Sequence, residues 1–135
     1  MAANTAPVFP NVPIVGAGLT SVTSQAALSG TSLTNGTTIV TGTTNGTKIE
    51  EITIVATGTS ILGTVNIFLV DVSNNWWFQD QAAIIVQTLT TGTPLTRWNK
   101  AYPNLIVPSG YTLSVTQTST GTQIPIAVTA LGGTF

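Results

Sequence analysis

The chain has 135 residues, a length that suits one domain with an ordinary core, and a net charge of −1. Only 5% of its residues are charged, against about 25% in a typical soluble domain. Three basic residues are too few to neutralise the phosphates of a nucleic acid, and the lack of histidine and cysteine removes the commonest general base and metal ligands. We therefore expect no nucleic-acid partner, no cofactor or metal, and no enzymatic activity.

The rest of the composition favours strands and turns, because the chain contains 27 threonines, 13 glycines and 7 prolines. The cores of protein interfaces are depleted in charged side chains, so a chain this poor in charge is typical of a protein that works inside an assembly. The alternative is an extracellular threonine-rich domain that stays soluble through hydroxyl and amide groups. The most apolar stretch, residues 61–72, is too short to span a membrane, so we expect no membrane partner.

Residues 1–18 are predicted to form an extended N-terminal arm that precedes a single β-sandwich domain at residues 19–135. Three prolines and two glycines in the arm disfavour a helix. Its apolar residues are candidate contacts with a neighbouring subunit, and they are Val8, Phe9, Val12 and Ile14. The arm does not begin with basic residues and has no long apolar run, so its sequence is not typical of a signal peptide.

The tetrapeptide Thr-Asn-Gly-Thr occurs twice, at Asn35 and at Asn45. Each asparagine satisfies the pattern for N-glycosylation, but that pattern acts only in a secreted chain. Asn-Gly also tolerates the positive φ angles of a two-residue hairpin turn, so we favour two turns with a short strand between them.

Eight segments are predicted to be strands, at residues 19–28, 37–41, 48–57, 63–72, 76–86, 95–101, 111–118 and 123–130. In the third, Ile49 is out of phase with Ile52, which predicts a bulge near Glu50. The fourth is apolar on both faces, which predicts a position in the middle of a sheet, and residues 73–75 predict a turn before the fifth. No segment suits a crossover helix, so the fold class is an all-β antiparallel sandwich, jelly-roll-like, with about eight strands.

Three consecutive aromatic residues, Trp76, Trp77 and Phe78, must point to alternate faces of a strand. One face can serve the core, whereas aromatic residues on the other are typical of protein interfaces or of sugar-binding surfaces. A simpler interpretation buries both faces within the fold. Trp98 raises the same question, because Arg97 and Lys100 are close enough in sequence to stack a cation on its ring.

Two aspartates flank the predicted turn at residues 73–75. Asp71 and Asp80 resemble a carboxylate pair for glycoside cleavage, although each is more simply a charge at the end of a strand. Residues 71–82 also begin like a calcium loop, but Trp76 and Ala82 replace the glycine and the glutamate that such a loop requires.

Four stretches of the sequence carry a resemblance to a known family. They are NTAPVFPNVPIVG, NGTKIEEITIVATGTSILGTVNIFLVDVSNN, LIVPSGYTLSVT and the closing ALGGTF. In this order and spacing they resemble a family of small virion structural proteins of tailed phages and prophages, over nearly the whole chain. The chain departs from that pattern at residues 75–78, which are more aromatic, and at residues 118–123.

The resemblance implies a capsid decoration, or cement, protein without enzymatic activity. Such a protein is made in the cytoplasm of the bacterial host, sits on the capsid surface, and contacts the major capsid protein and copies of itself, as a homotrimer. The alternative is a tail or fibre component that binds host glycan through Trp76, Trp77 or Trp98.

Overall fold

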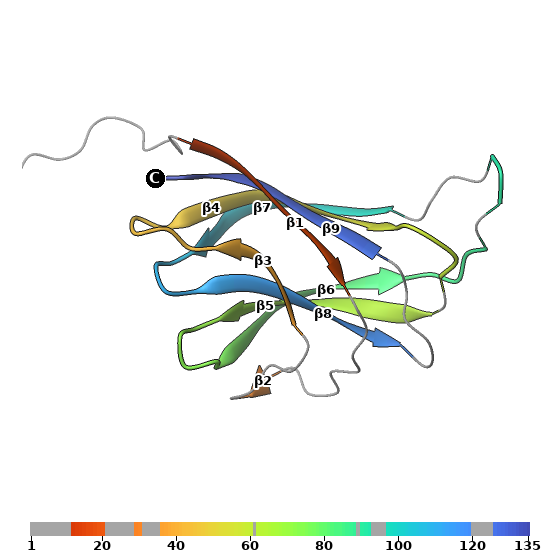
Figure 1. Cartoon of the computed structure of the whole chain (residues 1–135), viewed down its shortest axis with the longest axis horizontal. Helices are drawn as coiled ribbons and strands as arrows, with labels where there is room; N and C mark the ends of the chain where they lie inside the picture. The colour runs from red at the N-terminus through yellow and green to blue at the C-terminus, as the bar shows by residue number, and fades with distance from the viewer. Residues whose placement is uncertain are drawn as a thin grey trace, which may run out of the picture.

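The computed structural model describes residues 12–20, 29–30, 36–60, 62–88, 90–92, 97–119 and 126–135. Within these residues the chain is all-β, with no helix, and its strands form two antiparallel sheets (Figure 1). Val8 and Phe9 of the predicted arm lie outside the described residues.

One sheet has four strands in the order β1-β9-β4-β7, and the other has five in the order β2-β6-β5-β8-β3. The strands of the first sheet are β1 Val12–Thr20, β9 Ile126–Thr134, β4 Thr47–Ala56 and β7 Arg97–Val107. Those of the second are β2 Ser29–Gly30, β6 Trp76–Ile84, β5 Gly63–Val70, β8 Thr112–Ser119 and β3 Thr37–Thr41.

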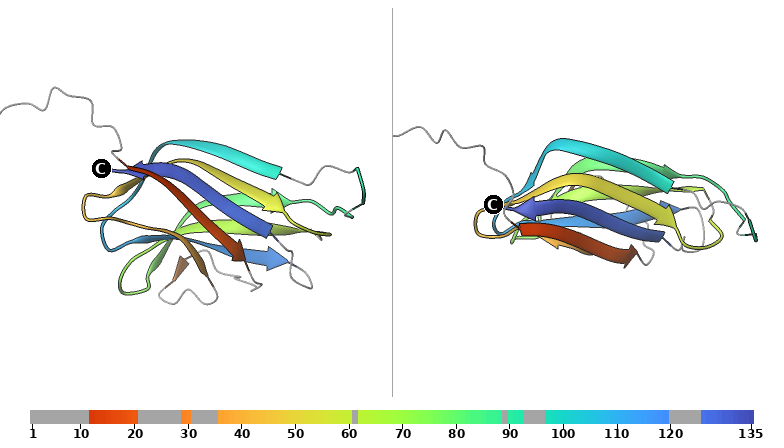
Figure 2. Two further views of the ribbon diagram at one scale, coloured as in Figure 1. Left: turned by 45° about the horizontal axis from the view of Figure 1, so that its top comes forward. Right: turned by 90° about the horizontal axis from the view of Figure 1, so that it is seen from above.

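The strand pairs are nested. β5 pairs with β6 in a hairpin, β4 pairs with β7 on either side of that hairpin, β3 pairs with β8, and β1 pairs with β9. These four pairs are joined into two layers by the further pairs β4·β9 and β5·β8. The two layers lie face to face in both views of Figure 2.

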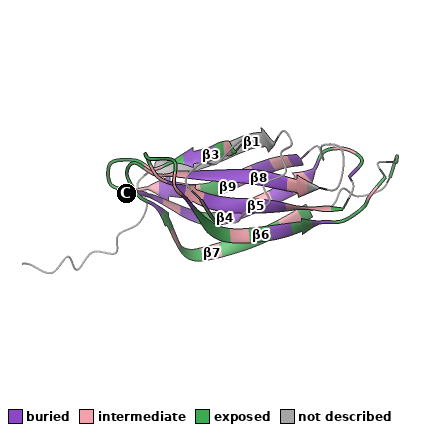
Figure 3. Ribbon diagram, turned by 90° about the horizontal axis from the view of Figure 1, so that it is seen from below, coloured by how far each residue is buried: buried purple, intermediate pink, exposed green. Residues whose placement is uncertain are grey.

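The hydrophobic core lies between the two layers. Alternate residues of β4, among them Ile52 and Ile54, are fully buried against Val65 and Ile67 of β5 in one cluster that draws on both sheets. Figure 3 shows the buried residues concentrated on β4, β5, β8 and β9, whereas β6 and β7 are largely exposed. A smaller cluster of Phe68, Val70 and Trp76 packs on the opposite face of β5 and β6.

Much of the predicted strand pattern is confirmed. β3 occupies residues 37–41 as expected, β5 lies between β6 and β8 in the middle of its sheet, and residues 71–75 form the turn between β5 and β6. Nine strands are described where about eight were expected, since β2 adds a two-residue pair. The first described strand, β1, begins at Val12, within the stretch assigned to the arm. It runs antiparallel to the C-terminal strand β9, from the pair Val12–Thr134 to the pair Thr20–Ile126.

The interpretation of Asn45 and Gly46 as a two-residue hairpin is wrong, although the turn is present. Gly46 has a φ of 91° and its amide donates to the Thr43 carbonyl at 2.9 Å, so the chain does reverse here. However, β3 and β4 on either side of the turn belong to different sheets, and Asn45 does not share the positive φ that such a hairpin needs. Asn35 lies outside the residues that the structure describes.

The predicted bulge in β4 is confirmed at Glu50. Ile49 pairs with Gly132 and Glu51 pairs with Leu131, so Glu50 is an extra residue opposite β9. The kinked backbone comes so close to β9 that a Cβ placed on Gly132 would lie 1.9 Å from the carbonyl oxygen of Lys48. Only glycine fits at this position, which explains one residue of the closing Gly-Gly pair.

The substitution Gly132→Ala tests this close approach. The methyl group must displace backbone rather than a flexible side chain, so we expect the free energy of unfolding to fall by about 3 kcal/mol or more. Gly92→Ala is the control, since a Cβ at Gly92 would have no heavy atom within 4 Å. The only cost of that substitution is the positive φ of 84°, about 1 kcal/mol. Urea denaturation of both variants measures the difference, and equal losses would contradict the close approach at Gly132.

Candidate functional site

Strand β7 carries a wide bulge in its middle. Ile49 of β4 pairs with Leu105, but Glu51 pairs with Ala101, so residues 102–104 of β7 stand opposite Glu50 alone. Pro103 lies inside this bulge, at the edge of the sheet, where its missing amide proton costs no ladder hydrogen bond. The predicted strand at residues 95–101 is too short, because β7 continues through Pro103 to Val107.

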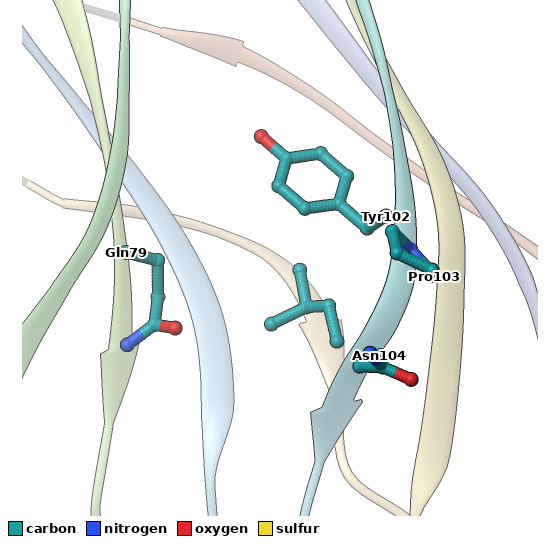
Figure 4. A pocket seen from close by; sticks show the side chains of 5 residues that line it. Gln79, Tyr102, Pro103 and Asn104 are labelled. Carbon is teal, nitrogen blue, oxygen red and sulfur yellow. The ribbon is translucent and has the colours of Figure 1, made fainter.

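Strand β6 has a bulge of its own, at Gln79. Ile67 of β5 pairs with Asp80 and Phe68 pairs with Phe78, so Gln79 is the extra residue. The bulged segments of β6 and β7 line a cavity of about 260 Å³, which we call the β6–β7 cleft (Figure 4). Its lining residues are Gln79, Tyr102, Pro103, Asn104 and Leu105.

Beside the cleft, one carboxylate links the two sheets. Lys100 Nζ and Tyr102 Oη of β7 both donate to Oδ2 of Asp80 on β6, each at 2.6 Å, and the Gln81 amide donates to Oδ1 at 2.9 Å. The Lys100 ammonium also lies 5.6 Å from the centre of the Tyr102 ring. These contacts fix the orientation of the Tyr102 ring at the wall of the cleft.

The same contacts shift two pKa values in opposite directions. Partial burial by itself would raise the pKa of the Asp80 carboxyl, but the hydrogen bonds from Lys100 and Tyr102 outweigh it and hold that pKa below its usual 3.8. Burial raises the pKa of the Tyr102 phenol strongly, and its hydrogen bond to the charged Asp80 adds to the rise. Asp80 is therefore ionised and Tyr102 protonated at neutral pH, which is the combination that the hydrogen bond requires.

The three tryptophans proposed as binding residues do not lie on one surface. Trp76 is 3% exposed and packs edge-on against Phe68, with ring centres 4.9 Å apart, while Trp77 is 56% exposed. The expected alternation of neighbouring aromatic residues between faces is thus confirmed. Trp98 of β7 is partly buried against the main core, and the cation near an aromatic ring is Lys100 over Tyr102 rather than over Trp98.

The two arm candidates that the structure describes lie at the sheet edge opposite to that of Trp98. Val12 and Ile14 belong to β1, and β1 and β7 are the two opposite edges of the four-stranded sheet. Asp71 also stands apart from Asp80, because Asp80 pairs with Ile67, four residues before Asp71. Asp71 accepts hydrogen bonds from the amides of Ser73 and Asn75 and from the Asn75 side chain, all at 2.9 Å. These bonds, led by the Asn75 side chain, lower the pKa of Asp71 and make it the cap of the β5–β6 turn.

The exposed surface combines large apolar side chains with few charges. Leu62, Ile85 and Val86 form an exposed aliphatic group at one end of β5 and β6, where Ser60 and Gln87 pair their backbones at 2.8 and 3.1 Å. Other large exposed apolar residues are Val72, Trp77, Phe78, Ile106 and Leu131. Such a surface suits contacts made by apolar packing and hydrogen bonds rather than by ion pairs.

Sequence reasoning missed the β6–β7 cleft and the contacts of Asp80. The one local sequence signal for the cleft is the Tyr-Pro pair at residues 102 and 103, and this pair indicates a bulge only if the segment is already known to be an edge strand.

No helix in the described part of the chain is long and apolar enough to cross a membrane. Comparison of the chain with family models, with curated proteins and with solved structures gives no match.

The link between the sheets at Asp80 gives a pH-dependent prediction. The pKa of Asp80 is lower in the folded than in the unfolded chain, so its stabilisation is complete above about 3.8 and is lost as the pH falls through the folded value. We expect Asp80→Asn to lower the free energy of unfolding near neutral pH by about 1 kcal/mol, a value reduced by the solvent exposure of Lys100. The difference from the wild type should shrink below pH 3.8.

Chemical denaturation across this pH range measures the effect. Glu50→Gln is the matched control, because Glu50 and Lys48 form a longer and more exposed pair, 3.4 Å apart, whose loss should cost at most about 0.5 kcal/mol. A loss in Asp80→Asn that stays constant from neutral to acidic pH would contradict the assignment.

Proposed function

We propose that the protein is a structural component of a bacteriophage virion, a decoration or cement protein bound to the outside of the capsid. The observation that carries this proposal is the surface, which is apolar and rich in hydroxyl groups but nearly without free charge. Of the seven charged side chains, Lys48 and Glu50 form one ion pair, and Lys100 and Asp80 form another. Few charges remain to keep a free subunit apart from its neighbours.

The strand order supports the proposal. When the two-residue β2 is set aside, the other described strands pair in a nested order, with the β5–β6 hairpin innermost and the β1–β9 pair outermost, and we interpret this order as that of a jelly roll. Jelly rolls are frequent in viral capsid proteins and in lectins. Fold alone does not determine function, so the argument rests on the surface and on the resemblance to small phage virion proteins.

The mechanism is selective binding to the assembled shell. A protein that binds the assembled form and not the free subunits of the major capsid protein shifts the equilibrium toward the shell. Apolar surface such as Leu62, Ile85 and Val86, together with Val8 and Phe9 of the arm, supplies the contacts, and copies of the chain associate as a homotrimer. Apolar contacts are not screened by salt, so the attachment persists at high ionic strength.

The alternative function, a tail or fibre component that binds host glycan through tryptophans, is left with one well-exposed candidate. Trp76 is buried and Trp98 is partly buried, so Trp77 alone presents most of its ring to solvent. If the protein is a glycan-binding tail component, the substitution Trp77→Ala should abolish glycan binding. If it is a decoration protein, the same substitution should leave capsid attachment intact.

Electron microscopy of particles from the phage or prophage that encodes the chain tests the location. We expect density for the protein on the head surface, at a copy number set by the capsid symmetry, and retention of that density after a wash in molar salt. Density confined to the tail, or release of the protein by salt, would contradict the proposal.

Removal of residues 1–11 tests the role of the arm. This deletion removes Val8 and Phe9 but leaves β1 intact, since β1 begins at Val12. We expect the shortened protein to fold with unchanged stability and to occupy the capsid at least about tenfold less, as loss of two apolar contacts would produce. Equal occupancy of both forms in a reconstitution with undecorated heads would show that the arm is not a capsid contact.

A further inference from the structure

The β6–β7 cleft lies between two strands at the outer side of their sheets. Among the residues that the structure describes, β7 is the edge of its sheet, and β6 is flanked on its outer side by the two-residue β2, which pairs with Trp76 and Trp77. Both strands are bulged at the cleft, so neither presents a regular row of amide and carbonyl groups to another strand. This edge is therefore better suited to hold a small molecule than to add a strand.

The lining of the cleft combines carboxamides with apolar groups and contains no charged side chain. Gln79 and Asn104 are exposed and carry carboxamide groups on opposite strands. Figure 4 shows Tyr102, Pro103 and Asn104 on one strand, across the cleft from Gln79, and Leu105 completes the lining. A neutral molecule that has hydroxyl groups on its rim and an apolar face matches this set. Sugar rings have that chemistry, because their C–H groups pack on aromatic and aliphatic side chains while their hydroxyls bond to amides.

The volume of the cleft suits a ligand of one ring. Its volume of about 260 Å³ falls below the range of about 300–1,000 Å³ that holds drug-sized ligands. An anionic ligand is not favoured, since Lys100, the cation beside the Tyr102 ring, is already paired with Asp80 at 2.6 Å.

The contacts of Asp80 make the site rigid before any ligand arrives. Asp80 accepts the hydroxyl proton of Tyr102 at 2.6 Å, so the phenol is held at the wall of the cleft and loses little further freedom on binding. The Gln79 side chain is similarly held, because its Nε2 donates to the carbonyl groups of Trp77 and Phe78.

From this geometry we infer that the β6–β7 cleft is a binding site for one neutral sugar unit, with Gln79 and Asn104 as hydrogen-bonding residues and Tyr102 as the surface on which the ring packs. The site goes beyond the proposed role in the virion and does not use Trp77. It is a property of the isolated chain, so it stands or fails independently of where the protein sits in a particle.

Saturation-transfer NMR with the full chain and the methyl glycosides of glucose, galactose, mannose and N-acetylglucosamine tests the inference. We expect transfer to at least one glycoside with a Kd of about 1 mM, as befits a ligand with few atoms in a shallow site. The side-chain amide signals of Gln79 and Asn104 should shift in the same titration.

Substitutions then locate the site. Gln79→Ala and Asn104→Ala change exposed side chains and should fold normally, yet each should raise the Kd about five- to tenfold through the loss of a hydrogen bond. Asn99→Ala is the matched control, an exposed carboxamide on the same strand whose amide bonds Glu51 and Thr53 outside the cleft, and it should leave the Kd unchanged.

Two results would overturn the inference. The first is the absence of transfer to all four glycosides. The second is binding that Trp77→Ala abolishes while Gln79→Ala and Asn104→Ala leave it intact, because the sugar would then occupy the exposed tryptophan and not the cleft.

Discussion

Nested antiparallel pairing of the described strands is the constraint on which the rest of the structure depends. It places the isoleucines and valines of β4 and β5 on facing layers, and their burial provides the main stabilisation of a chain that has no cysteine for disulfides. Within the described residues it also leaves β7 at a sheet edge and β6 with the two-residue β2 on its outer side. The bulges at Glu50, Gln79 and residues 102–104 adapt that pairing to the curvature of the layers, and two of them create the cleft.

The shortage of charge has different consequences inside and outside the fold. At the buried Asn66, polar side chains of the five-stranded sheet bond to one another, since Gln81 donates to Asn66 at 2.7 Å and Asn66 donates to Thr118 at 3.1 Å. Outside, the same hydroxyl and amide chemistry keeps the surface hydrated without giving it a net charge that would repel neighbouring copies. The proposed capsid attachment and the inferred sugar site both follow from this neutral surface, one through its aliphatic groups and the other through its carboxamides.

The features that could be predicted from the sequence are those encoded by neighbouring residues. The alternation of Ile52 and Ile54, the phase break at Glu50 and the turn after Asp71 all appear within a few residues, and the structure confirms each. The cleft could not be predicted, because it joins Gln79 to Asn104 across two sheets whose edges meet only in three dimensions. Asp80 and Lys100 are similarly twenty residues apart, and Asn45 was misassigned because its turn connects two sheets rather than two paired strands.

The central claim is that this charge-poor surface is covered by other subunits in the working state of the protein. Sedimentation equilibrium of the purified full chain over a wide concentration range, at low and at molar salt, tests it most directly. The account predicts a reversible association to a trimer that salt leaves unchanged or strengthens, since apolar contacts are not screened. A protein that stays monomeric at every concentration, or an association that high salt dissolves, would contradict it.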